Sequence, residues 1–402
     1  MSSSTDSIST LALPQGFPLR ALLILSLGVF VTVTAESLPA GLMPEMSADL
    51  DVSAMQVGML ISVWAMTVII TSIPLARATM WLDRRLVVGV SLGAFALANL
   101  GTALAPGYEL AMASRVAAAI AHGLFWAVVI VYASAMLAPS HLGRGLAIVT
   151  AGGTAATVAG LPVATVMAQA LGWRATFLAL GAVSLILGVV VVRGMPKFLP
   201  ARTTRADWVP LRKDSSVPAL LALGAAAILI ATAQFTSFTY IRPYFEVATS
   251  MDSEWAAGLL FIYGLAGLVG VVVAGLLADR FPRSSFIGVL VFFAGAFTVL
   301  TLMPRLPAAV IAGLLVWGFG IGAVFPLLQT SLMRAATDRT RTLASAGIGV
   351  FFNIGIAVGP WLGGTLGGDA APTVTTAVSA VAMVLAVALG FVGVALGARR
   401  RA

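Results

Sequence analysis

The chain has 402 residues, of which 60% are hydrophobic and only 9% are charged, and its mean hydropathy is +1.04. In soluble globular proteins about a quarter of the residues are charged. This composition therefore excludes a soluble globular protein and predicts a polytopic membrane protein. The net charge of +8 does not indicate nucleic-acid binding, because the basic residues fall in alternate loops rather than on one face. There is no cysteine, which excludes disulfides, thiol chemistry and cysteine-based metal sites.

The first 18 residues are polar and rich in Ser and Thr, and no basic stretch precedes the first apolar segment. They predict a disordered cytoplasmic tail before a retained helix, not a signal peptide. A spanning helix needs about 20 mostly apolar residues. Breaks at charged, Pro and Gly clusters predict twelve such helices, at 19–43, 54–77, 86–105, 110–137, 143–170, 173–193, 217–245, 255–278, 285–303, 306–332, 342–366 and 373–397.

The basic residues predict the orientation of these helices. If the N-terminus is cytoplasmic, most of the 23 Lys and Arg fall in inner segments, and the outer loops hold only Arg174, Arg242 and Arg305. Lys and Arg are enriched in cytoplasmic loops of membrane proteins. Both termini are therefore predicted to be cytoplasmic, which requires an even number of spans.

One long polar segment divides the chain into two parts of similar size. It predicts a cytoplasmic linker, and the last residues are basic. The predicted parts after the N-terminal tail are a six-helix bundle at 19–193, the linker at 194–216, a second six-helix bundle at 217–397 and a basic cytoplasmic tail at 398–402.

The two halves repeat a pattern. "RGLAIVTAGGTAATVAGLP", from Arg144, and "RTLASAGIGVFFNIGIAVGP", from Arg341, both begin Arg-x-Leu-Ala and lead through a Gly-rich helix to a proline. Repeated six-helix units are typical of secondary transporters, which bind their substrate near mid-membrane between the repeats. The predicted fold is all-α, with twelve transmembrane helices in two pseudo-symmetric bundles.

Several motifs follow one another along the chain. They are "TAESLPAGLMPEMSADLDVS" in the first span, "SRVAAAIAHGLFW" in the fourth, "GGTAATVAGLPVAT" in the fifth, "GWRATF" before the sixth, "FTYIRPYFE" in the seventh, "GLLADRFPR" after the eighth and "FNIGIAVG" in the eleventh. Together they resemble the major facilitator superfamily, and within it the twelve-helix drug:proton antiporters, especially the sugar-efflux and chloramphenicol-efflux members. The resemblance covers nearly the whole chain. It implies a monomer in a bacterial cytoplasmic (inner) membrane.

The resemblance also implies residues that gate transport. The fifth and eleventh helices are expected to pack across the interface between the halves, although ordinary packing within one half is the alternative. The loop motifs are expected to form an inner latch or, alternatively, a positively charged anchor. In the first-half loop Trp81 stands where the family has Asp. The implied gating residues are Gly160, Pro162, Gly359, Pro360, Gly275, Asp279, Arg280, Arg283, Arg84 and Arg85.

Two charged residues lie deep within the predicted spans. At 1.5 Å per residue, Glu36 lies roughly 10 Å and Arg115 roughly 8 Å below the outer surface. His122 follows Arg115 by nearly two turns, so it shares that face about 10 Å deeper, and Trp126 continues the face. A carboxylate at this depth is costly unless it is paired, protonated or facing water.

The functional hypothesis is a proton relay through Glu36, with Arg115 setting its protonation and His122 as a relay or substrate contact. A carboxylate that gains and loses an arginine contact as the protein changes shape could carry one proton per cycle. The alternative is a fixed ion pair that only ties the first helix to the fourth. For His122 the alternative is a core histidine bonded to a neighbour.

Other side chains are candidates for substrate binding by their position in the family, and each is also consistent with bridging helices. Arg242 and Tyr244 are interpreted instead as a snorkelling rim residue and an interfacial aromatic. The predicted substrate-binding residues are Glu36, His122, Trp126, Gln234, Tyr240, Asn353, Gln329 and Trp317. Further aromatic residues that could line a cavity are Trp64, Phe125, Phe235, Phe238 and Phe352.

The predicted function is proton-coupled export of a small organic molecule, such as a sugar or a chloramphenicol-like drug, by alternating access. Nucleosides are an alternative substrate class, and uptake by proton symport is the alternative to export. A membrane-embedded enzyme is disfavoured, because one Glu and one His supply no carboxylate pair or metal cluster. A sensor usually carries a large soluble domain, and none is present. The expected partners are the substrate and the lipid bilayer, with no nucleic acid, no metal and no cofactor except the coupling proton.

Overall fold

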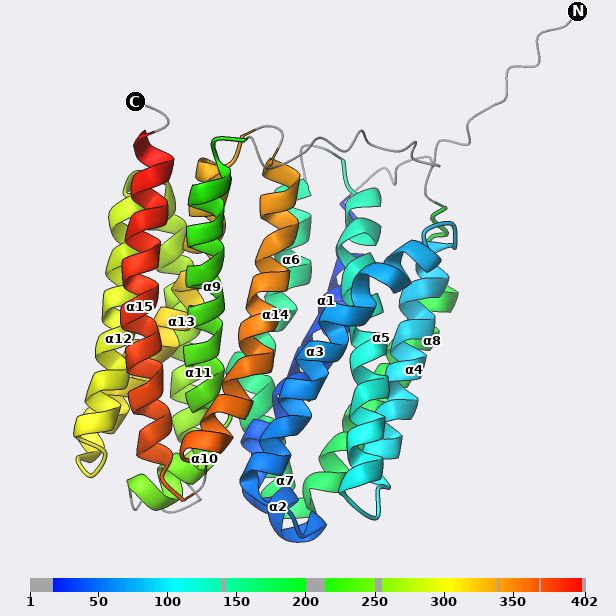
Figure 1. The fold of residues 1–402 in the computed structure, drawn as a ribbon. Coiled ribbons are helices and arrows are strands. Elements are labelled where there is room, and N and C mark those ends of the chain that lie inside the picture. The colour runs from blue at the N-terminus through cyan, green and yellow to red at the C-terminus, as the bar shows by residue number, and fades with distance from the viewer. Residues whose placement is uncertain are drawn as a thin grey trace, which may run out of the picture.

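The computed structural model describes residues 17–138, 142–199, 214–249, 255–337, 340–368 and 370–399, and their regular structure is helical (Figure 1). Within these described residues, twelve helices are long and apolar enough to cross a membrane, which confirms the predicted number and fold class. The helices are α1 (Leu19–Gly41), α2 (Met43–Leu50), α3 (Ala54–Ala78), α4 (Arg84–Ala103), α5 (Tyr108–Ala135), α6 (Leu142–Ala155), α7 (Leu161–Leu171), α8 (Trp173–Gly194), α9 (Val217–Phe238), α10 (Ile241–Pro243), α11 (Trp255–Arg280), α12 (Pro282–Leu302), α13 (Pro307–Ala335), α14 (Arg341–Leu366) and α15 (Pro372–Arg399).

Prolines break three of the predicted spans. The first ends at Gly41, and Pro44 stands in the first turn of α2. The seventh ends at Phe238 and resumes as α10 and a π-helical turn, η4 (Tyr244–Ala248). The fifth is divided into α6 and α7 by a second π-helical turn, η2 (Ala156–Gly160). A proline has no N–H and cannot complete the helical ladder, so each break lies beside one.

The division into two bundles and a linker stays a prediction, and α15 extends past the predicted boundary at 397 to Arg399. Residues 1–16 of the predicted tail, residues 200–213 of the linker and residues 400–402 lie outside the described residues. The linker prediction adjoins α8, which ends at Gly194, and α9, which begins at Val217.

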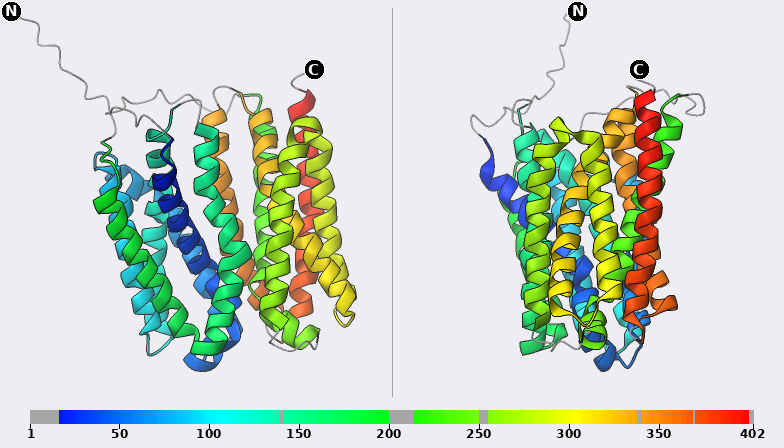
Figure 2. Two further views of the ribbon diagram at one scale, coloured as in Figure 1. Left: turned by 180° about the vertical axis from the view of Figure 1, so that it is seen from behind. Right: turned by 90° about the vertical axis from the view of Figure 1, so that its left-hand side faces the viewer.

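The first six spanning helices lie on one side of the molecule and the last six on the other. α1 begins and α15 ends at the same end, here called the terminal end, and the opposite end is called the remote end (Figure 2). α3 and α14 lie side by side near the remote end and diverge toward the terminal end (Figure 1). α11 also crosses to the first half, where Gly264 packs against Val158 of η2. The halves therefore meet mainly toward the remote end.

Most glycines of the fifth and eleventh spans pack against helices of their own half, although both spans also contact the other half, as expected. A β-carbon on Gly152 would lie 2.0 Å from the Ser26 carbonyl oxygen of α1, and one on Gly359 would lie 2.9 Å from the Thr232 carbonyl oxygen of α9. Each span contacts a different helix of the other half. In the fifth span, η2 and α7 contact α11, and the eleventh span, α14, contacts α3. Gly364 touches Met55 across the halves. Small residues permit close approach, but the sequence does not say to which neighbour.

The close approach of α11 and α13 in the second half depends on glycine. A β-carbon on Gly322 would lie 1.9 Å from the Gly267 carbonyl oxygen, closer than any real contact. Gly322→Ala is therefore expected to force the helices apart and lower the free energy of unfolding by about 1–3 kcal/mol. The midpoint of heat unfolding in detergent measures this.

Gly295 of α12 supplies the matched control, because a β-carbon there would meet no atom within 4 Å. Gly295→Ala is expected to leave stability within about 0.5 kcal/mol of the parent protein. Equal midpoints for the two variants would show that the α11–α13 approach does not depend on the missing β-carbon.

Candidate functional site

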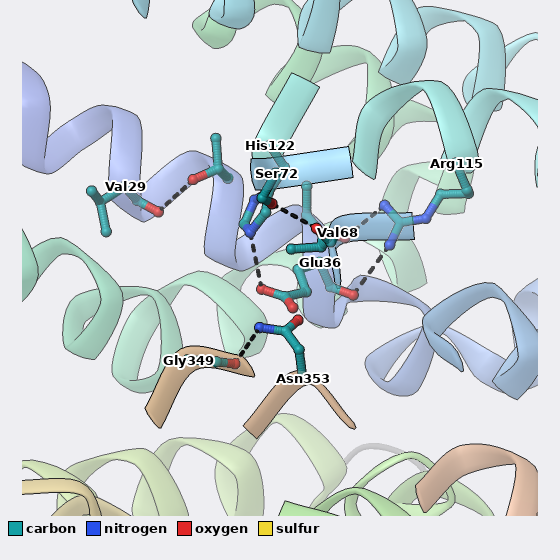
Figure 3. Close-up of polar contacts among 10 residues, drawn as sticks. Val29, Glu36, Val68, Ser72, Arg115, His122, Gly349 and Asn353 are labelled. Carbon is teal, nitrogen blue, oxygen red and sulfur yellow. Dashed lines mark hydrogen bonds and ion pairs between the residues drawn. The ribbon is translucent and has the colours of Figure 1, made fainter. Parts of the chain in front are cut away.

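The site begins with a defect in the backbone of α1. Pro39 has no N–H, so the carbonyl of Ala35, four residues earlier, has no partner within the helix. Arg115 of α5 donates from Nη1 to the Ala35 carbonyl oxygen at 2.9 Å and from Nη2 to the Glu36 carbonyl oxygen at 3.2 Å (Figure 3). Backbone groups at membrane depth must be satisfied by protein when lipid offers nothing. Arg115 therefore completes the hydrogen bonding that Pro39 interrupts.

The Arg115 guanidinium is fully buried against aromatic rings. Its Cζ lies 4.1 Å from the centre of the Trp64 ring and 5.8 Å from that of Phe177. A cation over an aromatic face is stabilised by the ring quadrupole, and this stabilisation strengthens when water is excluded. The positive charge is thus held by carbonyl dipoles and π systems.

The Glu36 carboxylate makes no ion pair with the Arg115 guanidinium, so the alternative of a fixed pair between the first and fourth spans is not what the structure holds. Its Oε2 lies 3.7 Å from Nε2 of His122, which is too long for a hydrogen bond but within reach of an ion pair if the imidazole is protonated. Helical side chains lean toward their own N-terminus. Glu36 leans toward the terminal end, and His122 lies in that direction, about two turns beyond Arg115 on α5.

Asn353 joins this group from the other half of the molecule. It lies on α14 and points toward the Glu36 carboxylate, while its Nδ2 donates to the Gly349 carbonyl oxygen at 2.9 Å (Figure 3). The Trp64 and Trp126 rings flank His122, with centroids 5.2 Å and 6.2 Å from the imidazole. A carboxylate, an imidazole and an amide beside aromatic rings can hydrogen-bond a small amphipathic molecule and can also hold a proton.

The other predicted binding residues of the second half are bonded within that half. Gln234 donates from Nε2 to the Tyr263 hydroxyl at 2.8 Å and accepts from Nε1 of Trp317 at 2.6 Å. Tyr240 donates to the Pro360 carbonyl oxygen at 2.9 Å. Gln234, Trp317 and Tyr240 are all buried, so their contacts fit the helix-bridging alternative. Gln329 is exposed near the terminal end of α13.

The π-helical turn η2 connects the Glu36 region with the second half. A β-carbon on Gly160 would lie 2.2 Å from Oγ1 of Thr34, two residues before Glu36. On its other side, a β-carbon on Gly264 of α11 would lie 2.6 Å from the Val158 Cα. π-Helical turns occur often at functional sites. Pro162 follows directly, at the start of α7.

The predicted inner latch divides into two groups. Arg84 donates to the carbonyl oxygens of Thr79 and Met80, and the Asp83 carboxylate accepts from the backbone N–H groups of Arg85 and Phe198. In the second group, the Asp279 side chain lies outside the described residues, Arg280 lies over the Phe281 ring, Arg283 is exposed, and a β-carbon on Gly275 would meet no atom within 4 Å. The latch stays a prediction.

The sequence suggested that Arg242 is a snorkelling rim residue and Tyr244 an interfacial aromatic, but both side chains are buried. The Arg242 side chain is 2% exposed and donates to the Gly41 carbonyl oxygen and to the carboxylates of Glu45 and Glu246. The Tyr244 hydroxyl is buried and donates to the Leu300 carbonyl oxygen at 2.6 Å. The spacing of Glu246, four residues after Arg242, was the available sign of pairing. Among the described residues no group of three or more His, Asp or Glu could hold a metal.

Twelve spanning helices in two halves, with a buried charged group beside the contact between them, define a membrane transporter rather than an enzyme. The model of the major facilitator superfamily matches residues 25–336 and 248–401, and the chain belongs to this family. Chloramphenicol efflux pumps from two strains of Mycobacterium tuberculosis are each 31% identical to it over 382 residues, covering 93% of this chain and 89% of each relative.

Solved structures share the fold at low sequence identity. One is a bacterial homologue of the human lysosomal transporter Spinster, inward-facing and unoccupied, with a TM-score of 0.74 and 14% identity, covering 96% of this chain and 98% of that one. Another is the peptide transporter POT in complex with alafosfalin, with a TM-score of 0.79 and 14% identity, covering 96% of each chain.

A double-mutant cycle tests whether Arg115 serves the proline break. Arg115→Gln is expected to lower the free energy of unfolding by about 2–4 kcal/mol, because it removes a buried cation that donates two hydrogen bonds to the backbone of α1. Pro39→Ala gives the Ala35 carbonyl a helical N–H partner of its own. In that background the loss caused by Arg115→Gln is expected to shrink by about 1 kcal/mol. Denaturant unfolding of the four proteins measures the cycle, and equal losses in both backgrounds would separate Arg115 from Pro39.

Proposed function

We propose that the protein is a proton-coupled exporter of small amphipathic molecules of the chloramphenicol type, with sugars as the second substrate class. It exchanges them for protons across the bacterial cytoplasmic membrane, with both termini cytoplasmic. The observation that carries this proposal is the Glu36 carboxylate, which faces His122 and Asn353 while Arg115 is bonded to the backbone. The relatives that are chloramphenicol efflux pumps support the substrate class.

Exchange follows if the proton and the substrate compete for the same carboxylate. An ionised Glu36 accepts hydrogen bonds from substrate hydroxyl or amide groups, and a protonated Glu36 loses most of that capacity. Trp126, which is only partly buried, offers apolar surface to the ring of an amphipathic substrate. Proton binding from outside then favours substrate release there, and proton loss to the cytoplasm restores the binding site.

The two halves supply different parts of this mechanism. Glu36 and His122 belong to the first half, and Asn353 reaches them from the second. A substrate bound between Glu36 and Asn353 contacts both halves, so it responds to their relative movement. In the proposed orientation the halves meet at the periplasmic end, and the substrate enters from the cytoplasm.

Glu36→Gln is the direct test. The amide keeps the size of the side chain but cannot be titrated, so flux driven by a pH gradient in proteoliposomes is expected to fall by about 100-fold or more. Exchange of chloramphenicol without a gradient is expected to continue. The substrate panel is chloramphenicol, arabinose and isopropyl-thiogalactoside, and it assigns the substrate class in the same assay.

Glu109→Gln is the matched control, because Glu109 is also a carboxylate on a first-half spanning helix, but it stands in the first turn of α5 at the remote end. It is expected to keep gradient-driven flux within about twofold of the parent protein. Full gradient-driven flux in Glu36→Gln would refute coupling through Glu36.

A further inference from the structure

Arg242 joins the two halves of the protein at the remote end. Its Nη1 donates to the Gly41 carbonyl oxygen at 3.1 Å, and its Nη2 lies 3.3 Å from Oε1 of Glu45 and 3.1 Å from Oε1 of Glu246. Gly41 ends α1 and Glu45 lies on α2, both in the first half. Arg242 and Glu246 lie on α10 and η4 in the second half. One guanidinium thus bonds both halves.

The surroundings of Arg242 belong to a closed interface. Thr239 and Tyr240, directly before α10, lie against Gly58 of α3, and Gly364 of α14 lies against Met55. The Arg242 side chain is 2% exposed. Burying an arginine is costly unless its donors are used, and most of the acceptors here come from the other half. The arrangement is therefore stable only while the halves are together at this end.

Glu246 gives Arg242 a partner that does not depend on the other half. If the halves separate, Arg242 loses Gly41 and Glu45 but keeps the carboxylate four residues along its own segment. The arginine is then never left as an unpaired charge, which lowers the barrier to opening. A reversible contact needs this property, whereas a permanent one does not.

Gly41 also places this contact close to the candidate site. It follows Glu36 by five residues on α1, with Pro39 between them. Arg115 holds the carbonyls of Ala35 and Glu36 on one side of Pro39, and Arg242 holds the carbonyl of Gly41 on the other. Movement at the remote end therefore acts on the same weakened stretch of helix that carries Glu36.

We propose that Arg242 is the gating residue of the remote end. Its bonds to Gly41 and Glu45 hold the halves closed there, and they break once per transport cycle while the bond to Glu246 persists. This rests on the proposed function, because it assumes alternating access, but it does not depend on which substrate or ion is carried.

The chain has no cysteine, so a single introduced thiol reports opening without a background. Thr239 is the position of choice, because it is fully buried against Gly58 of the other half and its hydroxyl has no hydrogen-bond partner. Thr239→Cys in intact cells is labelled with a membrane-impermeant maleimide added outside. Labelling is expected to be slow, and Arg242→Gln is expected to accelerate it by at least about fivefold.

Variants of the two carboxylates test the proposal even if Arg242→Gln misfolds, because they leave Arg242 in place. Their side chains are similarly exposed, 24% for Glu45 and 32% for Glu246, and both bond Arg242, but only Glu45 lies across the interface. Glu45→Gln is expected to accelerate labelling of Thr239→Cys, and Glu246→Gln is expected to accelerate it less. Labelling after denaturation gives the total thiol for each protein.

Unchanged labelling in both Arg242→Gln and Glu45→Gln would overturn the proposal, and so would equal acceleration by Glu45→Gln and Glu246→Gln. The labelling reads opening at the remote end and does not measure flux. Failure of the proposed function would appear as absent flux with these labelling differences intact, so the two failures can be told apart.

Discussion

The structure depends on one missing hydrogen-bond donor in α1. Pro39 leaves the Ala35 carbonyl without a helical partner inside a membrane-spanning helix. Arg115 satisfies that carbonyl, and this use of the guanidinium leaves the neighbouring Glu36 carboxylate to face His122 and the second half. A structural need thus places a buried cation close to a carboxylate without tying the two together. The site keeps a carboxylate that can change its partners.

The sequence predicted the fold well because membrane spans are a property of short stretches of chain. Runs of about 20 apolar residues can be recognised without any knowledge of tertiary contacts. The helix breaks were less accurate. Pro44 and Pro243 were visible, but the first and seventh spans were still drawn through Leu42 and Tyr240.

The site was predicted in composition and only partly in geometry. Glu36, Arg115 and His122 do gather, because helical spacing puts Glu36 and Arg115 at similar depths and puts His122 on the same helix face as Arg115. Their pairing was wrong, since the lean of each side chain along its helix decides which groups touch. The burial of Arg242 and the bonding of Gln234 depend on contacts between distant segments, which one sequence does not reveal.

The buried hydrogen-bond network of Gln234, Trp317 and Tyr263 in the second half carries no charge, so a transmembrane voltage exerts no net force on it. A transmembrane voltage acts on charge, with about 2.3 kcal/mol per elementary charge for each 100 mV. Glu36 and Arg115, the charged side chains deep in the described spanning helices, both belong to the first half. Rotation of the second half therefore moves neither of them through the field.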